Sequence, residues 1–148
     1  MNFVIAFSVV CVDQLSKFFI EKYLSVHRTI AVIPDIFHVS LVHNRGAAFG
    51  MLRNQLPLFI LTAVVAIILI YTMLKNQSLR RVSSYSVALS LILGGAVGNL
   101  IDRIFLGYVI DFLDFRIWPV FNIADSAITV GAVIIGWHII FVKQKAQA

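Results

Sequence analysis

Two aspartates, Asp111 and Asp125, stand in apolar surroundings where a carboxylate is expensive to keep. Asp111 follows Val109 and Ile110, and Asp125 lies near the start of a long apolar segment. An ionisable group in hydrocarbon costs about 2.5–3.5 kcal/mol on insertion scales. Two carboxylates that lie close together in a partly dry site share one proton, because both cannot readily ionise. Such a pair can activate a water molecule and protonate a carbonyl oxygen, which is the chemistry of aspartic proteases.

The composition predicts a membrane protein. Of the 148 residues, 60% are hydrophobic and only 13% are charged, against about 25% charged in average soluble chains. The net charge of +5 is spread along the chain, so we expect anionic lipid headgroups and no nucleic acid as partners. The length fits one membrane domain over residues 1–148.

Four segments are long and apolar enough to be transmembrane helices: about 3–20, 56–74, 82–103 and 122–142. We expect the first to be a retained helix, because no basic residue precedes Phe3 and no small-residue cleavage site follows. Residues 27–50 differ from these segments. The alternation over 37–41 predicts a strand, residues 44–46 a turn and residues 47–50 a return strand, which together would form a small antiparallel sheet at the membrane surface.

Other polar residues have two interpretations each. Asp13 and Lys17 are four residues apart, which fits either an ion pair with Lys17 reaching the interface or a polar site within the bundle. Asn99, Asp102 and Arg103 share one side of a helix, either as an interfacial anchor or as the wall of a site.

The glycines and the start of the last helix also have structural interpretations. Gly94 and Gly98 form a small-residue face for close helix packing. Asn122 and Asp125 fit a helix-capping box, which is compatible with catalysis by Asp125.

The sequence favours neither a metal nor a cofactor. The four histidines, His27, His38, His43 and His138, have no metal-ligand spacing, and the single cysteine excludes an internal disulfide or a cysteine-rich metal site. We therefore expect chemistry that depends on carboxylates alone.

Five motifs follow one another along the chain, within residues 13–17, 44–49, 94–103, 109–112 and 121–125. They read DQxSK, NRGAAF, GGAxGNLIDR, VIDF and FNxAD. In this order they resemble bacterial lipoprotein signal peptidase, also called signal peptidase II. The resemblance extends from about residue 13 to residue 131.

The resemblance implies an aspartic endopeptidase of the bacterial inner membrane. Such an enzyme removes the signal peptide from a prolipoprotein, cutting immediately before a cysteine that carries diacylglyceryl. It implies four transmembrane helices, with a small antiparallel β-sheet and the site at the outer surface and both termini in the cytoplasm. It also implies inhibition by globomycin-type cyclic peptides.

Residue by residue, the resemblance assigns Asp111 and Asp125 as the catalytic pair, at the outer ends of the third and fourth helices. It also assigns residues that line or support the site, namely Asp13, Lys17, Asn44, Gly46, Asn99, Asp102, Arg103, Asn122 and Ala124.

Two other classes of protein share some of these features. Intramembrane carboxylates also mark ion paths in transporters and proton channels, although we find no inverted repeat here. A membrane scaffold would use the same acids as caps and ion pairs, but it offers no reason for Asp111. Cleavage of lipidated and unlipidated precursors separates the three classes.

Overall fold

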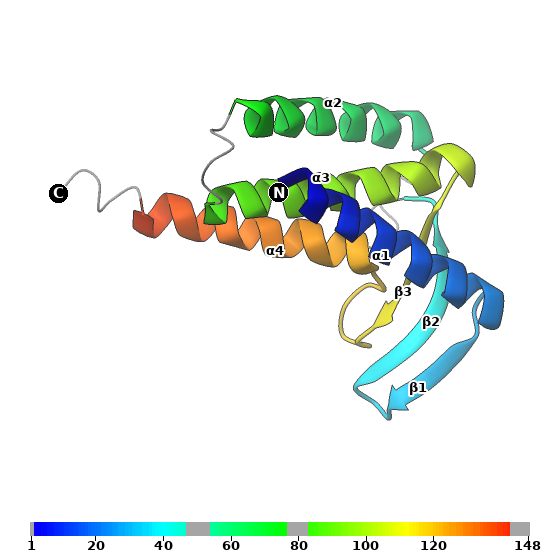
Figure 1. The fold of residues 1–148 in the computed structure, drawn as a ribbon. Helices are drawn as coiled ribbons and strands as arrows, with labels where there is room; N and C mark the ends of the chain where they lie inside the picture. Colours follow the sequence, from blue (N-terminus) through cyan, green and yellow to red (C-terminus); the bar gives the residue numbers. More distant parts are fainter. Residues whose placement is uncertain (1, 47–53, 77–82, 143–148) are drawn as a thin grey trace.

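The computed structural model describes residues 2–46, 54–76 and 83–142. Within these ranges it contains the helices α1 (Asn2–Tyr23), α2 (Leu56–Lys75), α3 (Ser84–Phe105) and α4 (Ile123–Trp137), the last continued by the π-helical turn η2 (His138–Val142). The strands are β1 (Thr29–Ile33), β2 (Phe37–Asn44) and β3 (Val109–Asp114). Figure 1 shows the helices side by side and the sheet at one end of them. Four helical segments are long and apolar enough to cross a membrane, which confirms the predicted fold class.

Helix α3 is the centre of the bundle, and glycines allow its neighbours to approach. A Cβ atom on Gly94 would lie 2.6 Å from the backbone oxygen of Ala6 in α1, and one on Gly95 would collide with the backbone oxygen of Ala124 in α4. A Cβ atom on Gly98 would lie 2.7 Å from Asp13 Oδ2. The predicted packing role of Gly94 and Gly98 is therefore confirmed, and Gly98 also makes room for a polar side chain.

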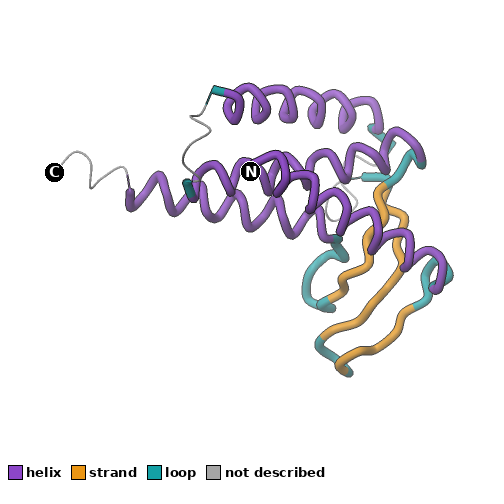
Figure 2. Tube along the Cα trace, viewed as in Figure 1, coloured by secondary structure: helices purple, strands orange, loops and turns teal. Residues whose placement is uncertain are grey.

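The sheet is antiparallel, with β2 between β1 and β3. The predicted strand over residues 37–41 is present and extends to Asn44. The predicted return strand at 47–50 lies outside the described residues. The strands that pair with β2 are Thr29–Ile33, which lies within the predicted β region 27–50 but was not predicted as a strand, and Val109–Asp114, which lies outside that region. In Figure 2 the strands gather where α1 ends and α4 begins.

Strand β3 changes the expected position of Asp111. The sequence places this residue at the end of the third helix, but α3 ends at Phe105 and Asp111 lies within β3. Five of the six β3 residues are buried, so the strand lacks the alternation by which half-buried strands are recognised. The pairing of β3 with β2, more than sixty positions earlier in the chain, turns the expected loop into a rigid strand.

Candidate active site

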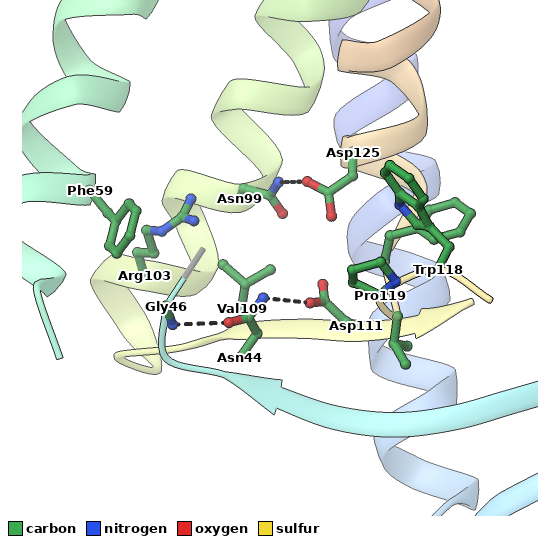
Figure 3. Close-up of a pocket in the computed structure, with 12 residues that line it drawn as sticks. Asn44, Gly46, Phe59, Asn99, Arg103, Val109, Asp111, Trp118, Pro119 and Asp125 are labelled. Atoms are coloured by element: carbon green, nitrogen blue, oxygen red, sulfur yellow. Dashed lines mark hydrogen bonds between the residues drawn. The ribbon is translucent and has the colours of Figure 1, made fainter. Parts of the chain in front are cut away.

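The site is a cavity of about 270 Å³ at the sheet end of the bundle. Helices α2, α3 and α4, strands β2 and β3 and the 115–121 loop all contribute to its wall. The lining residues are Asn44, Gly46, Phe59, Asn99, Arg103, Val109, Asp111, Trp118, Pro119, Val120, Phe121 and Asp125. Figure 3 shows the carboxylates of Asp111 and Asp125 facing each other across this cavity, with Arg103 and Phe59 at one end and Trp118 at the other.

Asp111 is buried and its two oxygens accept hydrogen bonds from amides. Asn44 Nδ2 donates to Oδ2 at 2.9 Å and Asn122 Nδ2 donates to Oδ1 at 2.7 Å. These bonds favour the ionised form, but burial and the charge of Asp125 oppose it more strongly and raise the pKa of Asp111 to about 7. The carboxyl of Asp111 can therefore hold a proton near neutral pH.

Asp125 sits in the first turn of α4, where the local sequence fixes its orientation. Asn122 is the N-cap: its Oδ1 accepts the Asp125 backbone N–H at 2.8 Å, and its own backbone N–H points to Asp125 Oδ2 at 3.4 Å. The predicted capping box is confirmed. Asn99 Nδ2 donates to Asp125 Oδ1 at 2.7 Å. Position at a helix N-terminus and these donors both favour an anionic carboxylate.

Asn122 connects the two aspartates. Its Oδ1 accepts from Asp125, while its Nδ2 donates to Asp111 and also reaches Asn99 Oδ1 at 3.0 Å and the Ile110 carbonyl at 3.2 Å. This fully buried side chain thus sets the position of α4 relative to β3.

A buried ammonium group lies behind the cavity. Lys17 Nζ is 2.7 Å from Asp13 Oδ2 and 2.8 Å from Asp102 Oδ2, and it donates to Asn99 Oδ1 at 3.1 Å. Only 1% of Lys17 is exposed, so the interpretation in which this residue reaches the membrane interface is wrong. Three acceptors replace the water that the ammonium would otherwise need, which makes its burial tolerable.

The same ion cluster holds the backbone next to both cavity aspartates. Asp13 Oδ1 accepts the N–H of Ala124, the residue before Asp125, at 2.9 Å. Asp102 Oδ2 accepts the N–H of Ile110, the residue before Asp111, at 3.1 Å. Lys17 therefore links the two segments that carry the cavity aspartates. The Asp13–Lys17 ion pair is present, and it is part of a polar site within the bundle, so these two predicted features occur together.

The remaining predicted residues divide between the cavity and its support. Asn44 lines the cavity, and its Oδ1 accepts the Gly46 N–H at 2.9 Å. Arg103 lines it too, with its guanidinium 5.2 Å from the Phe59 ring centre, a cation–π contact. Ala124 is buried and contributes its backbone N–H.

Three residues at the site were not assigned to it from the sequence. Gln14 donates to Asp102 Oδ1 at 2.8 Å and lies within a quoted motif, but we did not assign it to the site. Phe59 is one apolar residue in an apolar helix, and Trp118 is one aromatic residue near a helix end. Only the folded chain brings them to the cavity.

The 115–121 loop is anchored at both ends. Phe121 exchanges backbone hydrogen bonds with Leu113, at 2.8 and 3.1 Å. At the other end Asp114 accepts from Ser40 Oγ at 2.8 Å, from the Arg116 N–H at 2.8 Å and from Arg116 Nη1 at 3.1 Å. Burial alone would raise the pKa of Asp114, but these bonds outweigh it and hold the pKa below its usual range.

Among residues 2–46, 54–76 and 83–142, no group of three or more His, Cys, Asp or Glu side chains is arranged to hold a metal ion. The arrangement present supports acid–base chemistry by paired carboxylates, one of which holds a proton near neutral pH.

Four membrane-length helices and a carboxylate pair facing one cavity define the class of membrane-embedded aspartic peptidases. Comparison with known proteins identifies the family within this class. The family model described as "Signal peptidase (SPase) II" matches residues 5–141. The chain belongs to this family of aspartic peptidases.

Individual relatives agree with the family assignment. The chain is 52% identical over 143 residues to the lipoprotein signal peptidase of Caldanaerobacter subterraneus subsp. tengcongensis, covering 95% of this chain and 97% of that one. It is 47% identical over 140 residues to the lipoprotein signal peptidase of Moorella thermoacetica, covering 92% and 90%. A bacterial membrane enzyme solved by the in meso method at 2.3 Å superposes with a TM-score of 0.86 at 33% identity, covering 99% of this chain and 90% of that one.

Proposed function

We propose that this chain removes the signal peptide from prolipoproteins whose cysteine carries diacylglyceryl, cutting immediately before that cysteine. Asp111 and Asp125 are the catalytic pair in this proposal. Membership of the signal peptidase II family supports the reaction class. The observation that carries the residue assignment is the single cavity that both carboxylates line, in which the pKa of Asp111 is raised to about 7.

The two aspartates take different roles because their surroundings differ. Asp125, at the N-terminus of α4, is the ionised member and removes a proton from a water molecule held between the pair. That water attacks the scissile carbonyl carbon, while protonated Asp111 gives its proton to the carbonyl oxygen. Asp125 then passes its proton to the leaving amine, and Asp111 recovers a proton as the carbonyl re-forms. No covalent intermediate forms.

Other cavity residues hold the substrate backbone. Arg103 presents N–H donors to the cavity, and its stacking on Phe59 keeps the guanidinium oriented. The amide of Asn44 and the chain at Gly46 also line the cavity, at the end of β2. Residues Asp13, Lys17 and Asp102 position the catalytic segments without touching substrate.

The proposed setting is a bacterial inner membrane with both termini in the cytoplasm. The basic residues of the 75–81 region and of the C-terminal tail favour that orientation. The sheet and the cavity then lie at the outer face, where water, membrane lipids and a lipid-anchored peptide can meet. Globomycin-type cyclic peptides would inhibit by occupying the same cavity.

The test is cleavage of a purified diacylglyceryl prolipoprotein by Asp111→Asn and Asp125→Asn variants. Each is expected to lose activity by about 10²–10⁴-fold, the range for loss of a general acid or base. Asp35→Asn is the matched control, because Asp35 is an exposed residue between β1 and β2. Normal cleavage by either variant would refute the dyad, and equal cleavage of unlipidated precursor would refute the lipid requirement.

A further inference from the structure

A second cavity of about 480 Å³ adjoins the catalytic one on the α4 side. It is open along one flank and is lined by Phe115, Ile117, Trp118, Phe121, Asp125, Ser126, Thr129 and Val130. Three of these, Trp118, Phe121 and Asp125, also line the catalytic cavity, so the two spaces meet beside the catalytic carboxylate. We refer to this second cavity as the α4 groove.

The α4 groove is apolar except where it meets the catalytic cavity. Among the described residues that line it, Asp125 is the one that carries a charge, and the hydroxyl of Ser126 is already directed to the Asn122 carbonyl at 2.9 Å. Its outer rim is exposed on both sides, at Ile117 (95% exposed) and at Val130 (51% exposed). Helix α4 is long and apolar enough to cross a membrane, so in the proposed orientation this open flank would lie against the bilayer. A groove of this character accepts an uncharged apolar group.

The chemistry of the proposed substrate requires an apolar path by which its lipid can leave the catalytic cavity beside Asp111 and Asp125. The scissile carbonyl lies only a few covalent bonds from the sulfur that carries the glyceryl group. When the carbonyl is between Asp111 and Asp125, the lipid must therefore leave the catalytic cavity next to these residues. On the other side of the cavity, Phe59 and Val109 stand among the polar side chains of Asn44, Asn99 and Arg103, whereas the lining of the α4 groove is mostly apolar and begins at Asp125 itself.

We propose that the α4 groove receives the acyl chains of the diacylglyceryl group, which rests on the proposed function and deepens it. The groove allows the chains to remain in an apolar environment continuous with the bilayer while the cysteine is at the catalytic pair. The anchored 115–121 loop forms its outer wall, with Trp118 standing between the lipid and the peptide, on the α4 side of Asp125 in Figure 3.

The dimensions favour an acyl chain over the helical part of the signal peptide. The lining residues of α4 extend only from Asp125 to Val130, which is about 8 Å along a helix axis. A membrane-spanning signal segment is about 30 Å long and would need a groove along most of α4. A narrow, flexible chain can enter a short groove and continue into the bilayer.

Photo-crosslinking in lipid nanodiscs tests the assignment. Full-length Asp111→Asn enzyme is mixed with a prolipoprotein whose acyl chains carry a diazirine near the glyceryl group, and adducts are mapped by mass spectrometry. We expect adducts within residues 115–130. A second precursor, with the diazirine on an apolar residue in the middle of the signal peptide, is expected to label other segments. Lipid adducts confined to other segments, or labelling of the groove by the signal-peptide probe, would overturn the proposal.

A matched pair of variants adds an independent readout. Val130→Trp narrows the α4 groove, whereas Val133→Trp makes the same change at an exposed position of α4 outside it. Val130→Trp is expected to reduce both groove labelling and kcat/KM for the lipidated precursor by about tenfold or more, and Val133→Trp to change neither. Equal behaviour of the two variants would count against the groove. Failure of the wild-type enzyme to cleave the precursor would instead refute the proposed function, so the two failures are distinguishable.

Discussion

Two pairs of carboxylates lie near each other in this protein, and their surroundings differ. Asp13 and Asp102, here called the structural pair, are both in contact with the ammonium group of Lys17. Asp111 and Asp125, here called the cavity pair, receive hydrogen bonds from asparagine amides and share one cavity. The structural pair has the ammonium group of Lys17 as its partner, whereas the hydrogen bonds that the described part of the chain makes to the cavity pair come from amides.

This difference explains how one small bundle holds four acids for two purposes. A buried carboxylate in direct contact with an ammonium group has a partner of opposite charge, and its second oxygen can accept a backbone N–H group and fix the chain. A buried carboxylate that has only amide donors and a like-charged neighbour retains its proton more readily, as the raised pKa of Asp111 shows. The structural pair thus holds the backbone, and the cavity pair is left free to exchange protons.

The largest expected effect comes from removing the ammonium group of Lys17, which distinguishes the structural pair from the cavity pair. Lys17→Met leaves Asp13 and Asp102 buried without their cation, and breaking a buried ion pair costs about 3–5 kcal/mol. We expect a corresponding loss in the free energy of unfolding, measured in detergent micelles, together with loss of cleavage. Lys22→Met is the matched control on the same helix, because Lys22 is exposed. Equal stability of the two variants would show that Lys17 is not structural.

The second prediction concerns pH and the cavity pair. Because folding raises the pKa of Asp111 from 3.8 to about 7, the fold favours its protonated form. Its contribution to stability is therefore complete below about pH 4 and is lost as the pH rises through about 7. Asp111→Asn should remove this part of the pH dependence of the unfolding free energy. Cleavage by the wild type should fall about tenfold per pH unit above pH 7, as the pair loses its shared proton. A flat profile to pH 9 would contradict the assignment.

Variants of Asn122 can separate its role as the N-cap of α4 from its role as a hydrogen-bond donor to Asp111. Asn122→Ser retains a hydroxyl N-cap but loses the Nδ2 bonds to Asp111 and Asn99, and we expect cleavage to fall about 10–100-fold. Asn122→Ala removes the cap as well, with a further loss of about 1 kcal/mol in unfolding free energy. The measurements are kcat/KM and chemical unfolding of both variants. Equal stability of the serine and alanine variants would exclude the capping role.

The smallest effect on stability is expected from the ion pair between Arg116 and Asp114, next to the 115–121 loop. Arg116 is half-exposed and pairs with Asp114 at 3.1 Å, and exposed pairs contribute about 0–1 kcal/mol. Arg116→Ala should therefore lower the unfolding free energy by less than about 1 kcal/mol, and this loss should shrink at high salt. A loss as large as that of Lys17→Met would show that the distinction between exposed and buried ion pairs does not hold here.

Local sequence patterns were sufficient for the helices and for the cap on α4. Apolar runs of membrane length predict the four helices, and the spacing of Asn122 and Asp125 predicts a capping box, because both depend on neighbouring residues. Strand β3 was not predicted. It is almost wholly buried, so its residues do not alternate, and its hydrogen-bond partners are in β2.

The site residues divide in the same way. The ordered motifs indicated nearly all of its polar members, including Asn44, Asn99 and Arg103. They did not indicate Phe59 or Trp118, since an aromatic residue in an apolar chain has no distinctive neighbours. They assigned Lys17 to the site but did not show that it is buried, because its four-residue spacing from Asp13 fits an exposed ion pair as well as a buried one.

The sequence by itself determined the membrane class, the helices, the α4 cap and the identity of the acids, because composition, periodicity and motif order are local properties of the chain. Only the tertiary structure decided which acids meet which partners. Lys17 reaches Asp102 as well as Asp13 of its own helix because Gly94 and Gly98 allow α1 to approach α3. Asp111 faces Asp125 because β3 is paired with β2 and held by the ion cluster. These contacts join residues that are far apart in the chain. They determine the charges around each carboxylate, and those charges distinguish the structural pair from the cavity pair.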